Sequence, residues 1–135
     1  MPLTWNDTLS VGYAGMDEHH RAFVALLSQL NEAPPAELPA LYANFLEHLA
    51  EHFAYEEALM EAHGFGALKD HKAEHLRVLA EAREMERSLA RGRTAMIRQF
   101  LQSRMPEWFV LHRNTMDAAT AAFLREKGIE SPGGG

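Results

Sequence analysis

Two short stretches decide the fold of this chain: His52-Phe53-Ala54-Tyr55-Glu56-Glu57 and His71-Lys72-Ala73-Glu74-His75. In each stretch two metal-ligand side chains stand four residues apart, His52 with Glu56 and His71 with His75. Residues at this spacing lie one turn apart on the same face of an α-helix, so each pair can reach one point in space. The two stretches therefore predict two helices that direct ligands at a common site.

Apolar residues recur at three- and four-residue steps around these stretches, which is typical of helices that pack in a bundle. The pattern predicts helices over about 18–31, 39–62, 68–91 and 94–127. Asp17 is the expected N-cap of the first helix, and Gly64 and Gly92 are expected to end the second and third. No strand pattern competes. The predicted fold class is all-α, an up-down-up-down antiparallel four-helix bundle with short loops.

We expect residues 1–130 to form one domain, because 135 residues suffice for a single core. Met1–Met16 is predicted to be an extended N-terminal arm anchored by Trp5, and residues 131–135 a flexible tail. A bend is expected at Pro106, inside the fourth helix. The inward face predicted for that helix consists of Ile97, Leu101, Met105, Trp108, His112, Thr115 and Ala119.

Composition excludes several classes of function. The net charge of −6 argues against nucleic acid as a partner, since phosphate binding needs a basic surface. No apolar run reaches the length of a membrane span, and the first ten residues lack the pattern of a signal peptide, so we expect no membrane partner and a cytoplasmic location. The absence of cysteine excludes disulfides and thiolate chemistry.

Polar residues interrupt the inward faces of the predicted helices. They are His20, His52, Glu56, His71, His75 and His112. Burying such groups without partners costs several kcal/mol each, against roughly 5–15 kcal/mol of stability for a whole domain. A neutral imidazole has one donor and one acceptor, so these residues cannot satisfy one another. Their positions along the helices place them near the same end of an up-down bundle, where a metal would resolve the problem.

Asp117 follows His112 by five residues, which is about 140° around an α-helix and a poor angle for two ligands of one ion. Asp117 could instead reach sideways and bridge two ions, as could the longer Glu56. Five histidines and two carboxylates also exceed the ligands of one octahedral ion. Suppose that both carboxylates and one solvent oxygen bridge two ions. Three histidines then complete the six-ligand shell of one ion, and the other two histidines leave the second ion with five ligands and one open position. Such a ligand set favours iron or manganese over structural zinc.

The chain resembles the hemerythrin family, and within it the single-domain bacterial hemerythrins. The matching residues are Trp5, Val11-Gly12, Asp17-Glu18-His19-His20-Arg21, His52 through Met60, His71 through His75, Trp108 through His112, and Asp117. The resemblance implies a cofactor of two non-haem iron ions with an oxo or hydroxo bridge. It also implies the ligands of each ion. The six-coordinate iron would be bound by His71, His75 and His112, the iron with an open position by His20 and His52, and both irons by the bridging Glu56 and Asp117. This sequence departs from the family at His19, where glutamine is usual, and at His63-Gly64-Phe65, where Tyr-Pro is common.

The function that the resemblance implies is reversible dioxygen binding for carriage, storage or sensing, rather than catalysis. We expect a monomer whose partners are dioxygen and an unidentified oxygen-accepting protein. The oxygen pocket would be lined by Phe23, Phe53, Trp108 and Phe109, which exclude water. Two alternatives stay open: a di-iron oxidase, peroxidase or nitric-oxide-handling enzyme, and an oxygen-sensing interaction module. The absence of any Glu-x-x-His pair disfavours the first.

Three further histidines have no place in this ligand set. His19 is expected to be a solvated residue in the first turn of its helix. His48 lies off the inward face of the second helix, and His63 lies at the end of that helix. We expect all three at the surface.

Overall fold

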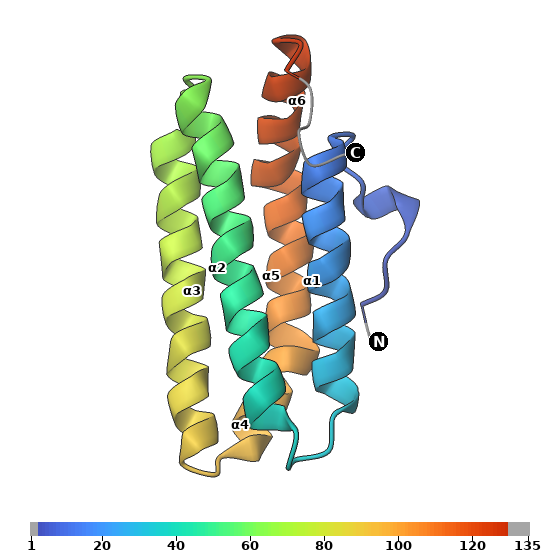
Figure 1. The fold of residues 1–135 in the computed structure, drawn as a ribbon, viewed down its shortest axis with the longest axis vertical. Helices are drawn as coiled ribbons and strands as arrows, with labels where there is room; N and C mark the ends of the chain where they lie inside the picture. The colour runs from blue at the N-terminus through green and yellow to red at the C-terminus, as the bar shows by residue number, and fades with distance from the viewer. Residues whose placement is uncertain (1–2, 130–135) are drawn as a thin grey trace.

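The computed structural model describes residues 3–129, which form helices and no strand (Figure 1). A 3-10 turn, η1 (Asp7–Leu9), precedes α1 (Ala14–Glu32), α2 (Leu38–Ala62) and α3 (Leu68–Ala90). The fourth helical rod joins, without a break, α4 (Thr94–Gln99), η2 (Phe100–Arg104), α5 (Met105–His112), η3 (Arg113–Asp117) and α6 (Ala118–Glu126). The four rods run alternately up and down, which confirms the predicted bundle. The predicted tail at 131–135 lies outside the described residues.

The helices end where the sequence predicted, but α1 begins earlier. Gly64 and Gly92 follow α2 and α3 with φ of 70° and 78°, a conformation that suits glycine. Asp17 is not an N-cap, because α1 begins at Ala14 and Asp17 lies in its first turn. Its buried carboxylate points back along the chain and accepts hydrogen bonds from the Val11 amide at 2.8 Å and the Ser10 hydroxyl at 2.6 Å.

The N-terminal arm therefore ends at Tyr13 rather than at Met16. Its buried anchors are Leu9, Val11 and Tyr13, whereas Trp5 is only half-buried. The guanidinium of Arg21 lies 4.9 Å from the centre of the Trp5 ring, a cation–π contact. Trp5 is thus one contact of the arm and not its main anchor.

Two arginines of the fourth rod also hold the arm, and no sequence pattern had indicated them. Arg113 donates from Nε to the Leu9 carbonyl at 3.0 Å and from a terminal nitrogen to the Ser10 carbonyl. Arg125 donates to the Val11 carbonyl. These bonds satisfy carbonyls that the irregular arm cannot pair within itself.

Two widened turns interrupt the fourth rod. In η2 the Met105 amide bonds to the Phe100 carbonyl, five residues back instead of four. This π turn immediately precedes Pro106, whose ring would clash with a carbonyl four residues before it in a regular helix. The chain accommodates Pro106 by this turn, at the place where the sequence predicted a bend.

The second widened turn, η3, corrects the predicted inward face. The Ala118 amide bonds to the Arg113 carbonyl, so η3 holds one residue more than an α-helical turn. The extra residue rotates the helix that follows. Thr115 and Ala119, predicted to point inward, are not buried, and the buried residues are Asp117, Thr120, Ala121 and Leu124.

The core consists of two apolar clusters with polar residues between them. In α1, His20 stands between Met16, which belongs to the smaller cluster, and Phe23, which belongs to the larger one. The fourth rod repeats this order, with its polar residues between Phe109 and Ala121. None of the helices among residues 3–129 has both the length and the apolar character needed to cross a membrane.

Candidate metal centre

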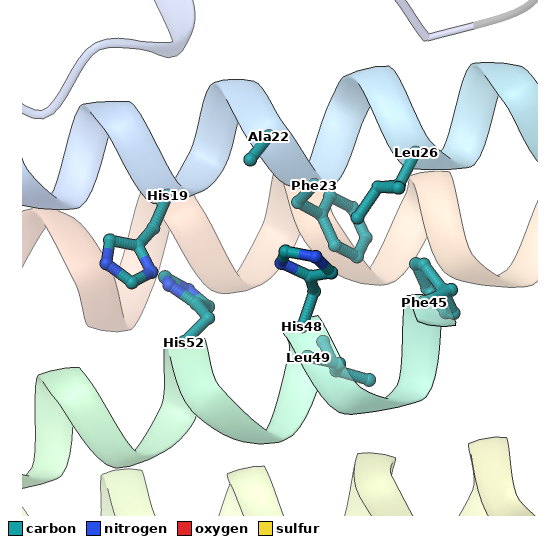
Figure 2. A pocket seen from close by; sticks show the side chains of 8 residues that line it. All are labelled: His19, Ala22, Phe23, Leu26, Phe45, His48, Leu49 and His52. Atoms are coloured by element: carbon teal, nitrogen blue, oxygen red, sulfur yellow. The ribbon is translucent and has the colours of Figure 1, made fainter. Parts of the chain in front are cut away.

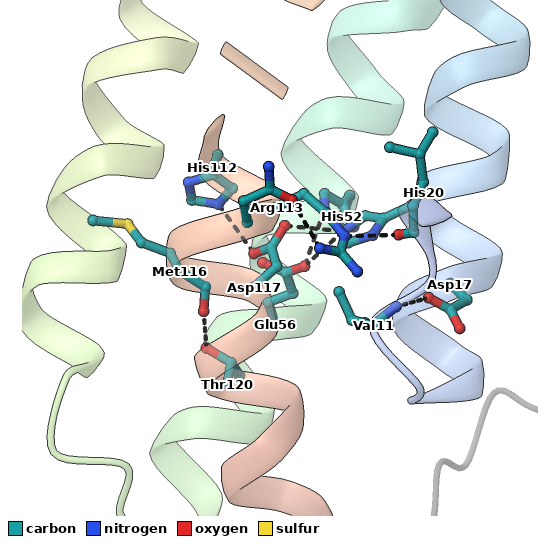
Figure 3. Close-up of polar contacts among 12 residues, drawn as sticks. Val11, Asp17, His20, His52, Glu56, His112, Arg113, Met116, Asp117 and Thr120 are labelled. Carbon is teal, nitrogen blue, oxygen red and sulfur yellow. Dashed lines mark hydrogen bonds and ion pairs between the residues drawn. The ribbon is translucent and has the colours of Figure 1, made fainter. Parts of the chain in front are cut away.

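All seven side chains that the sequence proposed as ligands meet in this polar layer. The four rods contribute them as follows: His20 from α1, His52 and Glu56 from α2, His71 and His75 from α3, and His112 and Asp117 from α5 and η3. Every one is buried. Figure 3 shows five of them, His20, His52, Glu56, His112 and Asp117. The helical spacing that suggested these residues therefore brings them together in space.

The ligand atoms form two groups that share both carboxylates. One group comprises His71, His75 and His112 with the carboxylates, and the other comprises His20 and His52 with the same carboxylates. Within each group the ligand atoms lie within 4.8 Å of one another. Three histidines in one group, two in the other and both carboxylates shared is the division that the ligand count predicted for two neighbouring ions.

Glu56 directs one oxygen at each group. Its Oε2 lies 3.3 Å from His20 Nε2 and 3.1 Å from His52 Nε2. Its Oε1 lies 3.4 Å from His71 Nε2 and 3.3 Å from His75 Nε2. A carboxylate divided in this way has the geometry to bridge two cations.

The carboxylate of Asp117 likewise directs one oxygen at each group. Its Oδ2 lies 3.0 Å from His20 Nε2, and its Oδ1 lies 3.1 Å from both His71 Nε2 and His112 Nε2. The contact with His112 contradicts the angular objection raised by an ideal α-helix. Because η3 adds a residue to the turn, side chains five apart come to the same face, as is common for π turns at functional sites.

The nitrogen and oxygen atoms of the site are better placed to bind a metal than to form hydrogen bonds with one another. His20 Nε2, His75 Nε2, both Glu56 oxygens and Asp117 Oδ2 are buried and make no hydrogen bond of acceptable geometry among the described residues. Orphaned buried groups of this kind are rare and costly. The spacing of 3.0–3.4 Å is close to the edge of an octahedron with bonds of about 2.1 Å, which is about 3.0 Å. The residues present therefore fit a pair of octahedral cations.

The electrostatics of the metal-free chain show how strongly these groups interact. Burial lowers the pKa of His20 and His71, but their contacts with Asp117 and Glu56 outweigh burial and raise each pKa to about 9. Burial raises the pKa of Glu56, but the charge of His52 and the histidine contacts outweigh it and hold that pKa well below its ordinary value. The pKa of Asp117 is likewise lowered, against burial and the neighbouring Glu56 charge. A cation would replace the protons that the histidines otherwise carry.

Two residues outside the ligand set orient histidines of the larger group. Thr120 Oγ1 lies 3.0 Å from His71 Nδ1, and Glu57 Oε2 lies 2.8 Å from His75 Nδ1. Such partners turn Nε2 of each ring toward the metal position. Sequence reasoning assigned no role to either residue. Glu57 is adjacent in sequence to the predicted ligand Glu56, which was a possible signal of its role. The inward position of Thr120 depends on the helix register after η3 and had no signal in the sequence.

The four predicted pocket aromatics are all buried but divide between the two groups. Phe109 meets the His20 ring edge-on at 5.3 Å between ring centres, and Phe23 stacks on Phe109 at 4.9 Å. Phe53 stacks on His75 at 4.0 Å, and Trp108 stacks on His112 at 4.6 Å. Phe53 and Trp108 therefore hold rings of the three-histidine group, and Phe23 with Phe109 cover the two-histidine group.

The remaining histidines lie outside the centre. His48 is exposed as predicted, and His63 is half-buried rather than fully at the surface. His19 is not a solvated residue: its ring stacks on Tyr55 at 4.4 Å and lies 5.4 Å from the His52 ring. Burial, followed by the charge of His52, lowers the pKa of His19. The sequence missed this packing because it depends on how closely α1 and α2 approach.

Fold and site together define a four-helix bundle with a buried cluster of histidines and carboxylates that could hold cations. A family model described as "Hemerythrin HHE cation binding domain" matches residues 11–122. The chain belongs to the hemerythrin family, as its sequence motifs suggested.

Named relatives support the same placement. The chain is 37% identical to a Bacteriohemerythrin of Ralstonia nicotianae over 96% of its own length and 93% of that protein. It is 30% identical to a hemerythrin chain of Sipunculus nudus, over 86% of this chain and 88% of the relative. A Bacteriohemerythrin of Stenotrophomonas maltophilia is 27% identical over 98% of this chain and 91% of its own length.

Proposed function

We propose that this chain binds dioxygen reversibly at two non-haem iron ions held in the buried centre. The observation that carries the proposal is the division of Glu56 and Asp117, each with one oxygen toward the two-histidine group and one toward the three-histidine group. Membership of a cation-binding family supports iron as the metal. Imidazole and carboxylate ligands in octahedral geometry suit that metal.

The ligand roles follow from the two groups. His71, His75 and His112 would hold one iron ion, His20 and His52 the other, and the two carboxylates would bridge. The two-histidine group offers one protein ligand fewer, so it would leave room for dioxygen. Two iron ions held in this centre would supply the electrons that dioxygen binding requires and would recover them on release.

The surrounding residues limit the access of water to this position and hold the rings in place. Phe109 and Phe23 cover the two-histidine group, and Phe109 is only 2% exposed. Limited access reduces the chance that water displaces a bound ligand or carries protons to it. Glu57 and Thr120 keep Nε2 of His75 and His71 directed at the metal.

The test is an absorption spectrum of anaerobically reduced, iron-loaded protein before air, after air and after argon sparging. A near-ultraviolet and visible band that appears with oxygen and disappears under argon is the expected result. One irreversible change to a ferric spectrum would contradict reversible binding. Steady consumption of peroxide or nitric oxide with a supplied reductant would instead favour the enzyme alternative.

A further inference from the structure

A small cavity between α1 and α2 adjoins the two-histidine group. Its volume is about 20 Å³, enough for one water molecule, which needs about 10–15 Å³. Three histidines face it: His19 from α1, and His48 and His52 from α2 (Figure 2). Its remaining wall is apolar and includes Phe23, Phe45 and Leu49. Two of the three histidines that the metal centre leaves unused therefore line one opening beside it.

The exposure of these histidines decreases toward the centre. His48 is exposed, His19 is half-buried and His52 is buried. His52 Nε2 in turn lies 3.1 Å from Glu56 Oε2, inside the centre. His48 and His52 are four residues apart on one helix, so their rings lie one turn apart on the same face. Imidazole nitrogens thus extend from solvent to the buried carboxylate.

We propose that this cavity is the port through which divalent metal enters the centre, with His48 and His19 binding the ion before His52 receives it. The inference rests on the proposed metal centre and goes beyond it by assigning the loading route. Each imidazole nitrogen that binds the ion replaces one of its waters, and the ion keeps its oxidation state throughout.

The size of the cavity explains why ligands are needed there. On the measure by which one water needs about 10–15 Å³, six waters of hydration need roughly 60–90 Å³, so a hydrated ion cannot pass intact through a cavity of about 20 Å³. Removing those waters in an apolar passage without replacement is prohibitively unfavourable. Imidazole is a suitable replacement, because it is a common ligand of iron and neighbouring transition metals.

The receiving histidine is also the less constrained kind. His71 and His75 are fixed at Nδ1 by Thr120 and Glu57. His52 Nδ1, by contrast, has no hydrogen-bond partner among the described residues. The same is true of His20 and His112, so no hydrogen bond at Nδ1 fixes which nitrogen of these rings takes an ion. Among these rings, His52 is the one that lines the cavity.

The opposite face is less suited to cation entry. A larger cavity of about 410 Å³ reaches His112 between α3 and the fourth rod, but two guanidiniums, of Arg77 and Arg104, line it. It also holds two carboxylates, Glu74, which is paired with Arg77, and Glu107, so its charges balance. No histidine beyond His112 is among the described residues that line this cavity. The wall therefore offers no succession of imidazole ligands leading inward.

The experiment follows cobalt(II) uptake by the metal-stripped full chain in a stopped-flow spectrometer, using the visible absorption of the bound ion. The first variant, His19→Ala/His48→Ala, removes the two outer ligands. The second, Ala22→Phe, narrows the cavity without touching a histidine, because Ala22 lines it. His63→Ala controls for loss of a histidine elsewhere, and Thr115→Phe narrows the cavity on the opposite face. Final stoichiometry is measured by elemental analysis.

We expect His19→Ala/His48→Ala and Ala22→Phe, the two port variants, to bind as much cobalt(II) as the wild type but on the order of tenfold more slowly. A factor of about ten is the smallest loss of metal affinity or activity typical when residues that contact metal ligands are replaced. Both controls should load at the wild-type rate. Wild-type rates in both port variants, or slowing only in Thr115→Phe, would overturn the route. A wild-type chain that binds no cobalt(II) would instead contradict the metal centre itself, and the route with it.

Discussion

The hydroxyl of Thr120 decides which nitrogen of His71 can face a metal. It has one hydrogen to donate, and two acceptors lie beside it: the Met116 carbonyl at 3.0 Å, the stronger acceptor, and Met60 Sδ at 3.7 Å (Figure 3). At its remaining neighbour, His71 Nδ1 at 3.0 Å, the hydroxyl oxygen must then accept. A neutral His71 would therefore carry its proton on Nδ1, which leaves the lone pair of Nε2 free to bind a metal.

Replacing Thr120 by valine preserves the shape of the side chain and removes this acceptor. The Nδ1–H of His71 is then buried without a partner, which costs roughly 1–3 kcal/mol. His71 can avoid that cost by moving its proton to Nε2, but this removes the lone pair that would bind metal. Either outcome weakens metal binding by about 10–100-fold, since 1.4 kcal/mol corresponds to a factor of ten.

The assay is competition for cobalt(II) or iron(II) against a chelator of known affinity, under anaerobic conditions. Thr115→Val is the matched control, because Thr115 also donates to a carbonyl four residues back, that of Leu111 at 2.8 Å, but is exposed and touches no ligand. Thr120→Val should lose affinity, and Thr115→Val should not. Equal affinities in the two variants would refute the assignment of the His71 tautomer.

Three further outcomes are expected. Glu56→Gln removes the charge that both groups share, so elemental analysis should find fewer than two metal ions per chain. Circular dichroism should still report a helical fold. Two bound ions would exclude Glu56 as a bridge. Phe109→Ala opens space beside His20, so the oxygenated form should decay faster in air, measured as the half-life of its visible band; an unchanged half-life would remove Phe109 from the pocket. In the metal-free chain, His20 and His71 have a folded pKa of about 9 against an ordinary 6.5, so the stability they contribute is complete below about pH 6.5 and lost as the pH rises through 9. Urea unfolding should then show a loss on the order of 3 kcal/mol for each histidine between pH 6.5 and 9, absent when metal is bound. A flat profile without metal would show that these histidines are not paired with the carboxylates.

Helical periodicity was enough to predict the bundle and the meeting of the ligands other than Asp117. His52 with Glu56 and His71 with His75 stand at a spacing that a helix brings within one turn on one face, and their heights in an up-down bundle agree. The contacts of Arg113 and Arg125 with the arm could not be predicted in this way. A long side chain that reaches an irregular carbonyl leaves no periodic signal in the sequence.

The register of the fourth rod marks the limit of such reasoning. An ideal α-helix places His112 and Asp117 about 140° apart and sends Thr115 and Ala119 inward. The π turn η3 reverses both predictions with one residue, bringing Asp117 Oδ1 within 3.1 Å of His112 Nε2 and turning Thr120 toward His71. Nothing local in Arg113–Asp117 demands that turn. What favours it is the interior, because a regular turn would take Asp117 away from the histidines it contacts and leave Thr120 out of reach of His71. The same turn thus supplies a shared carboxylate and the partner that orients a ligand, so a change that regularised η3 would cost the centre both at once.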